Sequence, residues 1–213
     1  MLADARPCPA AWRNLWAGRT AFVLASGPSL TLSDVTRVRR YAQANDCPVL
    51  VTNSTYRLAL WADVLFFHHS QWRRVHGEDV LRNFAGQIVT VCELAHPRML
   101  NLRKQPFNAY KNSGGGAISF AMYAGAQRVV TLGLDGQPAD DGRQHWHAPD
   151  SVLGDATGLS LFLPCFPALA QDAAQQGVEI INASRQTAIT CFQRQPLQTI
   201  LAPRVVEEEP WTC

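Results

Sequence analysis

The chain has 213 residues, of which 47% are hydrophobic, so it is long enough for one sizeable core and short for two separate domains. Lysine and arginine exceed aspartate and glutamate by only two, 19 against 17, which excludes the strongly basic proteins that bind nucleic acid non-specifically. There is no run of about 18 apolar residues and no basic segment followed by an apolar stretch, so we expect a cytoplasmic protein without membrane span or signal peptide.

The six cysteines stand singly, without a C-x-x-C pair, which favours neither a zinc site nor a disulfide framework. We expect a single domain over residues 1–213, with its core at about 19–195 and a frayed acidic tail at 205–213.

Short apolar runs alternate with longer amphipathic stretches, a pattern typical of parallel strands joined by helical crossovers. The predicted strands are, in chain order, 20–26, 48–53, 62–68, 87–92, 128–134 and 178–183. These runs predict an α/β fold with one mostly parallel sheet of about six strands and helices on both faces.

After the first strand, Ser33 is placed to cap a helix that runs through about Ala44. The exposed face of that helix carries Arg37, Arg39 and Arg40.

A second helix is predicted from about Gly116 to Tyr123, with Gly125 ending it before the next strand. The segment 133–158 follows that strand and is the longest stretch without periodicity. Long loops in compact domains are commonly functional, so we expect this one to contribute to a site.

Small polar residues follow nearly every predicted strand. In open α/β sheets, ligands bind beyond the carboxyl ends of the strands, so these residues are expected to converge on one site. They are Ser26-Gly27-Pro28-Ser29, Asn53-Ser54, His68-His69-Ser70, Asn112-Ser113-Gly114, Asp135 and Asn182 to Ser184.

Two glycine-containing segments have the composition of anion sites. Gly27 and Pro28 shape a turn in which the amides around Ser29 would point at an anion, or the turn simply joins a strand to a helix. The run Asn112 to Gly116 would present the N-terminus of a helix to a phosphate, the alternative being a flexible linker.

Other candidates each carry a functional and a structural interpretation. Asn53 has an amide suited to a base or a ribose, and is equally typical of a strand-end turn. Asp135, with Asp140 and Asp141, has the hard oxygen ligands that Mg²⁺ prefers, or it caps the turn after its strand while the other two are solvated.

His145 and His147 lie two residues apart on either side of Trp146. A zinc site would need a third ligand, for which His68, His69 and His76 are the candidates. A single histidine acting as general base is simpler, because an imidazole titrates near neutral pH. A surface loop without a catalytic role is the structural alternative.

Four segments, in this chain order, resemble a known group of proteins: LASGPSL, VTNSTYRLA, NSGGGAISFAMYAGAQRVVTLGLD and INASRQTAITCF. They resemble the Rossmann-like superfamily that includes the Campylobacter-type CMP-sialic acid-dependent sialyltransferases and the MptE-like hydroxymethylpterin pyrophosphokinases. With WADVLFFHHSQW and HWH added, the chain is most similar to proteins encoded in phages and prophages. The resemblance covers roughly residues 19–195 and implies a Rossmann-like nucleotide-binding domain in the cytoplasm of a bacterial host.

The resemblance also implies residue roles. His145 or His147 corresponds to the base that takes the proton of an acceptor hydroxyl. The residues expected to contact the nucleotide are Ser26, Gly27, Pro28, Ser29, Asn53, Asn112, Ser113, Gly114, Asp135 and Ser184.

Three functions are compatible with these roles. The leading hypothesis is a phage-type transferase that passes a group, most plausibly a sugar, from a nucleotide-activated donor of the CMP-sugar kind to a hydroxyl acceptor. The second is Mg²⁺-dependent pyrophosphoryl transfer from ATP, with Asp135 helping to place the metal. The third is a non-catalytic nucleotide-binding protein that acts in phage–host interaction. A homo-oligomer with Trp12, Trp16 and Trp72 at its interface is an alternative to packing these residues in the core.

Overall fold

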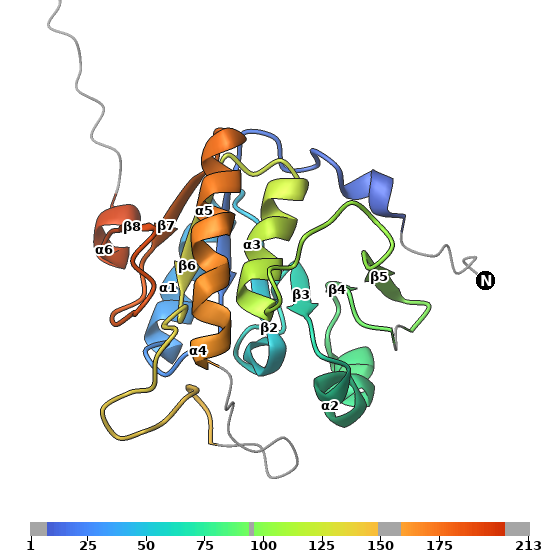
Figure 1. Cartoon of the computed structure of the whole chain (residues 1–213), viewed down its shortest axis with the longest axis horizontal. Coiled ribbons are helices and arrows are strands. Elements are labelled where there is room, and N and C mark those ends of the chain that lie inside the picture. The colour runs from blue at the N-terminus through green and yellow to red at the C-terminus, as the bar shows by residue number, and fades with distance from the viewer. Residues whose placement is uncertain (1–7, 94–95, 149–158, 203–213) are drawn as a thin grey trace, which may run out of the picture.

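The computed structural model describes residues 8–93, 96–148 and 159–202 (Figure 1). The described residues form an α/β fold with one sheet of eight strands, in the order β5-β4-β3-β2-β1-β6-β7-β8. Every neighbouring pair is parallel. The predicted tail at 205–213 lies outside the described residues.

The six predicted strands are all present, each shorter than its apolar run. Two further strands, β5 and β8, extend the sheet at its two edges. They escaped prediction because they have only three and two residues, too few for a periodic pattern. The bounds are β1 Thr20–Leu24, β2 Val49–Thr52, β3 Val64–Phe67, β4 Gln87–Thr90, β5 Met99–Asn101, β6 Arg128–Leu132, β7 Glu179–Asn182 and β8 Gln193–Arg194.

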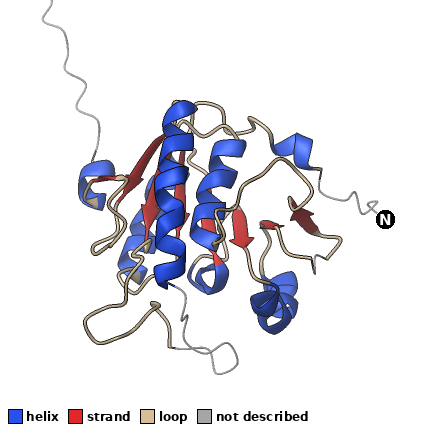
Figure 2. Cartoon of the chain, in the orientation of Figure 1, coloured by secondary structure: helices blue, strands red, loops and turns tan. Residues whose placement is uncertain are grey.

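Helices cover both faces of the sheet (Figure 2). One face packs against α3 (Ser113–Tyr123) and α5 (Phe166–Gln175). The other face packs against α1 (Leu32–Ala44), α2 (Ser70–Asn83) and α6 (Leu197–Ile200). The shorter helical segments are η1 Pro9–Trp12, η2 Asn53–Leu58, α4 Leu159–Phe162 and η3 Leu163–Cys165.

The strand order reverses at β1. The chain passes from β1 to β2 on one side, whereas β6 lies on the other side of β1. In doubly wound sheets this switch point opens a crevice at the carboxyl ends of the two central strands. The loops after β1 and β6 therefore occupy the position where such folds bind ligands.

Both predicted helix starts are wrong by a few residues, because other side chains supply the caps. Thr31, not Ser33, caps α1: its hydroxyl accepts a hydrogen bond from the Asp34 N–H at 3.2 Å, within a reciprocal capping box. Helix α3 begins at Ser113 rather than Gly116, because the Asn112 side chain accepts from the Gly115 N–H at 2.6 Å.

Close packing explains part of the glycine-rich run. A Cβ on Gly116 would lie 2.2 Å from Cε1 of Phe66, which is fully buried in β3.

Trp16 and Trp72 are only 4% and 6% exposed, so both belong to the core. Among the described residues, no helix combines the length and apolar character needed to cross a bilayer.

Candidate functional site

The segments that follow β1, β2, β3, β6 and β7 lie at one edge of the sheet, at the lower edge in Figure 1. This is the convergence that the sequence predicts for parallel strands. The predicted residues form two groups, one at the start of α3 and one around Asp135, while Ser26 bonds to the segment after β2.

Ser26 ties the β1 loop to the segment after β2. Its hydroxyl donates to the Thr52 carbonyl at 3.1 Å and lies 2.9 Å from Oγ1 of Thr55. Thr55 in turn bonds the Ala25 carbonyl at 3.2 Å. Ser26 is 8% exposed, and its hydroxyl already joins the β1 loop to the segment after β2 without any ligand.

Gly27 and Pro28 form the turn after β1, packed tightly on the segment after β6. The Gly27 N–H donates to the Gly133 carbonyl at 2.8 Å. A Cβ at Gly27 would lie 2.4 Å from that carbonyl oxygen and 2.6 Å from Cγ of Asp135. Close approach to β6 therefore requires the glycine, whether or not an anion binds there.

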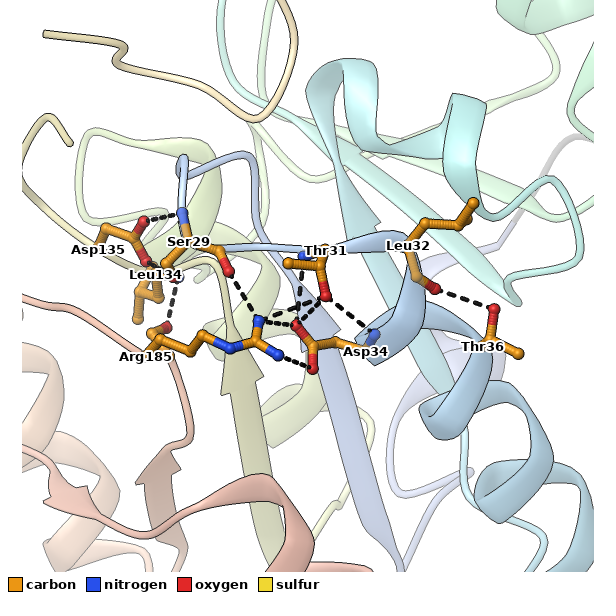
Figure 3. A network of polar contacts seen from close by, with 9 residues as sticks. Ser29, Thr31, Leu32, Asp34, Thr36, Leu134, Asp135 and Arg185 are labelled. Atoms are coloured by element: carbon orange, nitrogen blue, oxygen red, sulfur yellow. Dashed lines mark hydrogen bonds and ion pairs between the residues drawn. The ribbon is translucent and has the colours of Figure 1, made fainter. Parts of the chain in front are cut away.

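Ser29 is clamped by Asp135 (Figure 3). The Ser29 N–H donates to Oδ2 of Asp135 at 2.7 Å, and its hydroxyl donates to Oδ1 at 2.6 Å. The amide that was expected to face an anion thus faces this carboxylate. Asp135 is 2% exposed, and burial raises its pKa, while the Ser29 hydrogen bonds oppose that rise. Next to it, the Ser184 hydroxyl accepts from the Leu134 N–H at 2.8 Å.

The second group forms at the start of α3. The Ser113 hydroxyl donates to Oδ1 of Asn53 at 2.9 Å and accepts from the His68 N–H at 3.1 Å. This contact fixes the Asn53 amide and turns its Nδ2 donor away from Ser113; Nδ2 has no partner among the described residues. Asn53 has a φ of 46°, a left-handed conformation that the fold imposes at the end of β2.

The first turn of α3 provides backbone donors beside Asn53. The N–H groups of Ser113 and Gly114 have no acceptor within the described chain, as expected for the first residues of a helix. Asn112 holds this turn in place, since its Nδ2 also donates to the Tyr110 carbonyl at 2.7 Å. Gly114 is partly exposed, so the positive end of the α3 dipole reaches the edge of the sheet.

His68 lies half-buried against the same turn. Its Nδ1 is buried without a hydrogen-bond partner, and burial together with the neighbouring His69 lowers the pKa of His68 to about 4. The ring is therefore neutral at pH 7. Within the described ranges, no three histidine, cysteine, aspartate or glutamate side chains are grouped as a metal site would need.

The histidine loop, residues 144–148, packs on the β1 loop. The Trp146 N–H donates to the Ser26 carbonyl at 3.2 Å, and its indole donates to Thr55 Oγ1 at 3.1 Å. Nδ1 of His145 lies 3.3 Å from the same Ser26 carbonyl. A carbonyl only accepts, so this contact places the proton on Nδ1 and makes Nε2 the basic nitrogen.

His147 stacks on His145, with ring centroids 5.2 Å apart. Its Nδ1 lies 2.7 Å from the Ala148 carbonyl, which favours the same tautomer. The structure thus places His145 against the Ser26 carbonyl and stacks His147 on His145. The rest of this loop, 149–158, lies outside the described residues. Asp141 is exposed, and its carboxylate pairs with Nε of Arg143 at 2.7 Å.

No family model matches the chain, and no curated protein is significantly similar to it.

A cavity of about 430 Å³ opens at the same edge, on the α1 side of the sheet. Ser29 and Ser184 line it, and so do three arginines, Arg37, Arg185 and Arg194. We call it the arginine cavity. Arg37 was expected on the exposed face of α1, but it is half-buried because it lies one turn beyond Asp34 on the side of α1 that lines the cavity. The helical spacing of Asp34 and Arg37 was the signal for this in the sequence.

Proposed function

We propose that the protein is a transferase that binds a nucleotide-activated donor between the β1 loop, Asn53 and the start of α3, and transfers the activated group, most simply a sugar, to a hydroxyl acceptor. The observation that supports this most is the Ser113–Asn53 hydrogen bond of 2.9 Å at the N-terminus of α3. It joins two predicted nucleotide contacts from segments 60 residues apart at the carboxyl edge of the sheet.

The donor groups at this point suit the phosphate of a nucleotide. The first turn of α3 has two N–H groups without an acceptor among the described residues, the Asn53 amide lies beside it, and the helix dipole adds partial positive charge. In the transition state these groups would stabilise the charge that develops on the leaving phosphate oxygen. Pre-oriented donors of this kind lower a barrier by about 2.7–4 kcal/mol each.

The transfer step is a direct displacement. The acceptor hydroxyl oxygen forms a bond to the donor carbon that carries the phosphate, and the bond from that carbon to the phosphate oxygen breaks. The electron pair leaves with the nucleotide, and the hydroxyl proton moves to Nε2 of His145 or His147. Contacts of Nδ1 with the Ser26 and Ala148 carbonyls support this choice of nitrogen.

The first test is nucleotide binding, measured by thermal shift and calorimetry with CMP, CDP, UDP, GDP, ADP, ATP and sugar conjugates, with and without Mg²⁺. Asn53→Asp keeps the acceptor for Ser113 and tolerates the left-handed backbone, but it replaces the amide donor with a carboxylate. We expect a loss of affinity of about tenfold or more, since a hydrogen bond to a charged group contributes about 1.5–3 kcal/mol.

Asn14→Asp is the matched control. Asn14 is also a left-handed asparagine, with φ 60°, but it contacts the opposite end of α3 through Tyr123. It should leave nucleotide affinity unchanged. Gln replacements of His145 and His147 should keep affinity, and the one that carries the base should slow transfer by about 10²–10⁴-fold.

Other outcomes identify the competing functions. A shift with ATP that requires Mg²⁺, followed by release of AMP, would replace this proposal with pyrophosphoryl transfer. A nucleotide recovered intact after incubation with acceptors would indicate a non-catalytic binding protein. If the Asn53→Asp and Asn14→Asp variants bind the nucleotide with equal affinity, the nucleotide does not bind at this edge of the sheet.

A further inference from the structure

The arginine cavity combines an apolar floor with a cationic rim. Leu30, Leu132 and Leu197 are each at most 5% exposed and form part of its wall. The guanidinium groups come from three separate elements: Arg37 from α1, Arg185 from the segment after β7, and Arg194 from β8. The tertiary structure alone brings these elements together.

The lining carries excess positive charge. Arg185 pairs with Asp34, donating through both terminal nitrogens, one of them at 2.9 Å from Oδ1 (Figure 3). That pair is electrically neutral and leaves Arg37 and Arg194 in excess. Asp135 is not part of the lining, but it lies behind Ser29 and interacts electrostatically with Arg194, so it offsets part of that arginine's charge and the lining stays net positive.

The two excess arginines have donors to offer a ligand. Arg37 has no hydrogen bond or ion pair with any described residue, although it is half-buried. Arg194 uses one terminal nitrogen, which donates to the carbonyls of Ser184 at 2.7 Å and Arg185 at 3.2 Å. Its remaining N–H groups have no partner within the described chain. Arg185 also donates to the Ser29 carbonyl at 3.2 Å, which holds the rim in place.

We propose that the arginine cavity binds a phosphate monoester whose organic body is apolar or planar. A volume of about 430 Å³ falls in the range of small-molecule sites. The net positive charge of the lining suits a phosphate monoester, which carries about 1.5–2 negative charges at pH 7. Planar guanidinium forks suit its oxygens, and the leucine floor suits the organic body.

The cavity lies on the α1 side of the sheet, whereas α3, whose first turn belongs to the proposed nucleotide site, packs on the opposite face; Ser29 of the β1 loop borders the cavity. Binding of the ester does not depend on the proposed function.

Calorimetric titration with phenyl phosphate, inorganic phosphate and benzoate at constant ionic strength tests the proposal. The informative variant is Arg37→Gln, because Arg37 has no hydrogen bond or ion pair with a described residue that the fold would lose. Arg40→Gln is the matched control, since it removes the same charge from an exposed position of α1 outside the cavity. Thermal unfolding of both variants checks that they fold like the parent.

We expect saturable binding of phenyl phosphate, tighter than that of inorganic phosphate because of the apolar floor. Arg37→Gln should weaken it about tenfold or more, and Arg40→Gln should leave it unchanged. Equal losses in the two variants, equal affinity for benzoate, or no saturation would overturn the proposal. Asn53→Asp should keep phenyl phosphate binding, so failure of the nucleotide site and failure of this cavity are distinguishable.

Discussion

At the scale of single residues, the carboxyl edge is dominated by polar groups that satisfy one another. Asp135 is buried, and a buried carboxylate is costly unless donors compensate for the lost water. The Ser29 N–H and hydroxyl supply that compensation at 2.7 and 2.6 Å. The pair therefore fixes the β1 loop on the segment that follows β6.

We predict that Asp135→Ala destabilises the fold by about 1–3 kcal/mol, because it leaves the Ser29 N–H without an acceptor. Asp135→Asn should cost less, since one amide oxygen remains. Urea denaturation at pH 7 measures both. Equal stability of the alanine variant and the parent would show that the clamp does not support the loop.

The asparagine variant also isolates a dependence on pH. The pKa of Asp135 is raised by burial, so the folded state holds the proton more tightly than the unfolded state does. Its contribution to stability is present below about pH 3.9 and declines as the pH rises through the raised pKa. Between about pH 3.9 and the raised pKa, the parent should therefore lose stability relative to the asparagine variant, which has no carboxyl group to titrate. Above the raised pKa, the difference in the free energy of unfolding between the two proteins should stay constant.

At the scale of elements, glycines set how closely α3 approaches the sheet. Gly116 faces the Phe66 ring of β3, where a Cβ would lie 2.2 Å from Cε1. The sequence predicted the glycine run as an anion loop, and the structure adds packing as an independent reason for Gly116. The start of α3 is thus both a close contact with the sheet and the source of the donors at the candidate site.

Gly116→Ala should destabilise the protein by about 1–3 kcal/mol through overpacking, which exceeds the gain of about 1 kcal/mol in helix propensity. Adding Phe66→Leu should recover part of the loss, because a smaller side chain leaves room for the methyl group. Ser119→Ala on the same helix is the control and should be near neutral. The measurement is the free energy of unfolding in denaturant, and additive losses in the double variant would contradict a direct clash.

At the scale of the whole molecule, stability against acid depends on two adjacent histidines. The pKa of His68 is lowered to about 4 and that of His69 is lowered as well, in both cases mainly by burial. The unfolded chain binds these protons more tightly, so stability is fully present above about pH 6.5 and is lost as the pH falls towards 4. The raised pKa of Asp135 has the opposite effect, because its contribution to stability declines as the pH rises.

We therefore expect the His68→Gln variant to lose less stability than the parent as the pH falls from 6.5 to 4. Urea denaturation at each pH measures the free energy of unfolding of both proteins. The substitution leaves the backbone N–H that donates to Ser113 in place. If the free energy of unfolding falls equally with pH in the variant and the parent, protonation of His68 is not coupled to unfolding.

The sequence by itself determined the central strands and the edge at which the site lies. Both are encoded locally: apolar runs mark strands buried on two faces, and polar residues follow where those runs end. It also placed the histidine loop and Asn53 among the candidates, although it could not say which of their atoms would already be engaged.

Only the tertiary structure decided which polar groups remain open to a ligand. Ser29 and Asp135 are 106 residues apart in the chain, and no local pattern indicates that each satisfies the other. The arginine cavity likewise needs α1, β7 and β8 to meet at one edge, and β8 has only two residues. The physical reason is that burial follows from local patterns of apolar residues, whereas hydrogen-bond partners and excess charge depend on which distant segments the fold brings together.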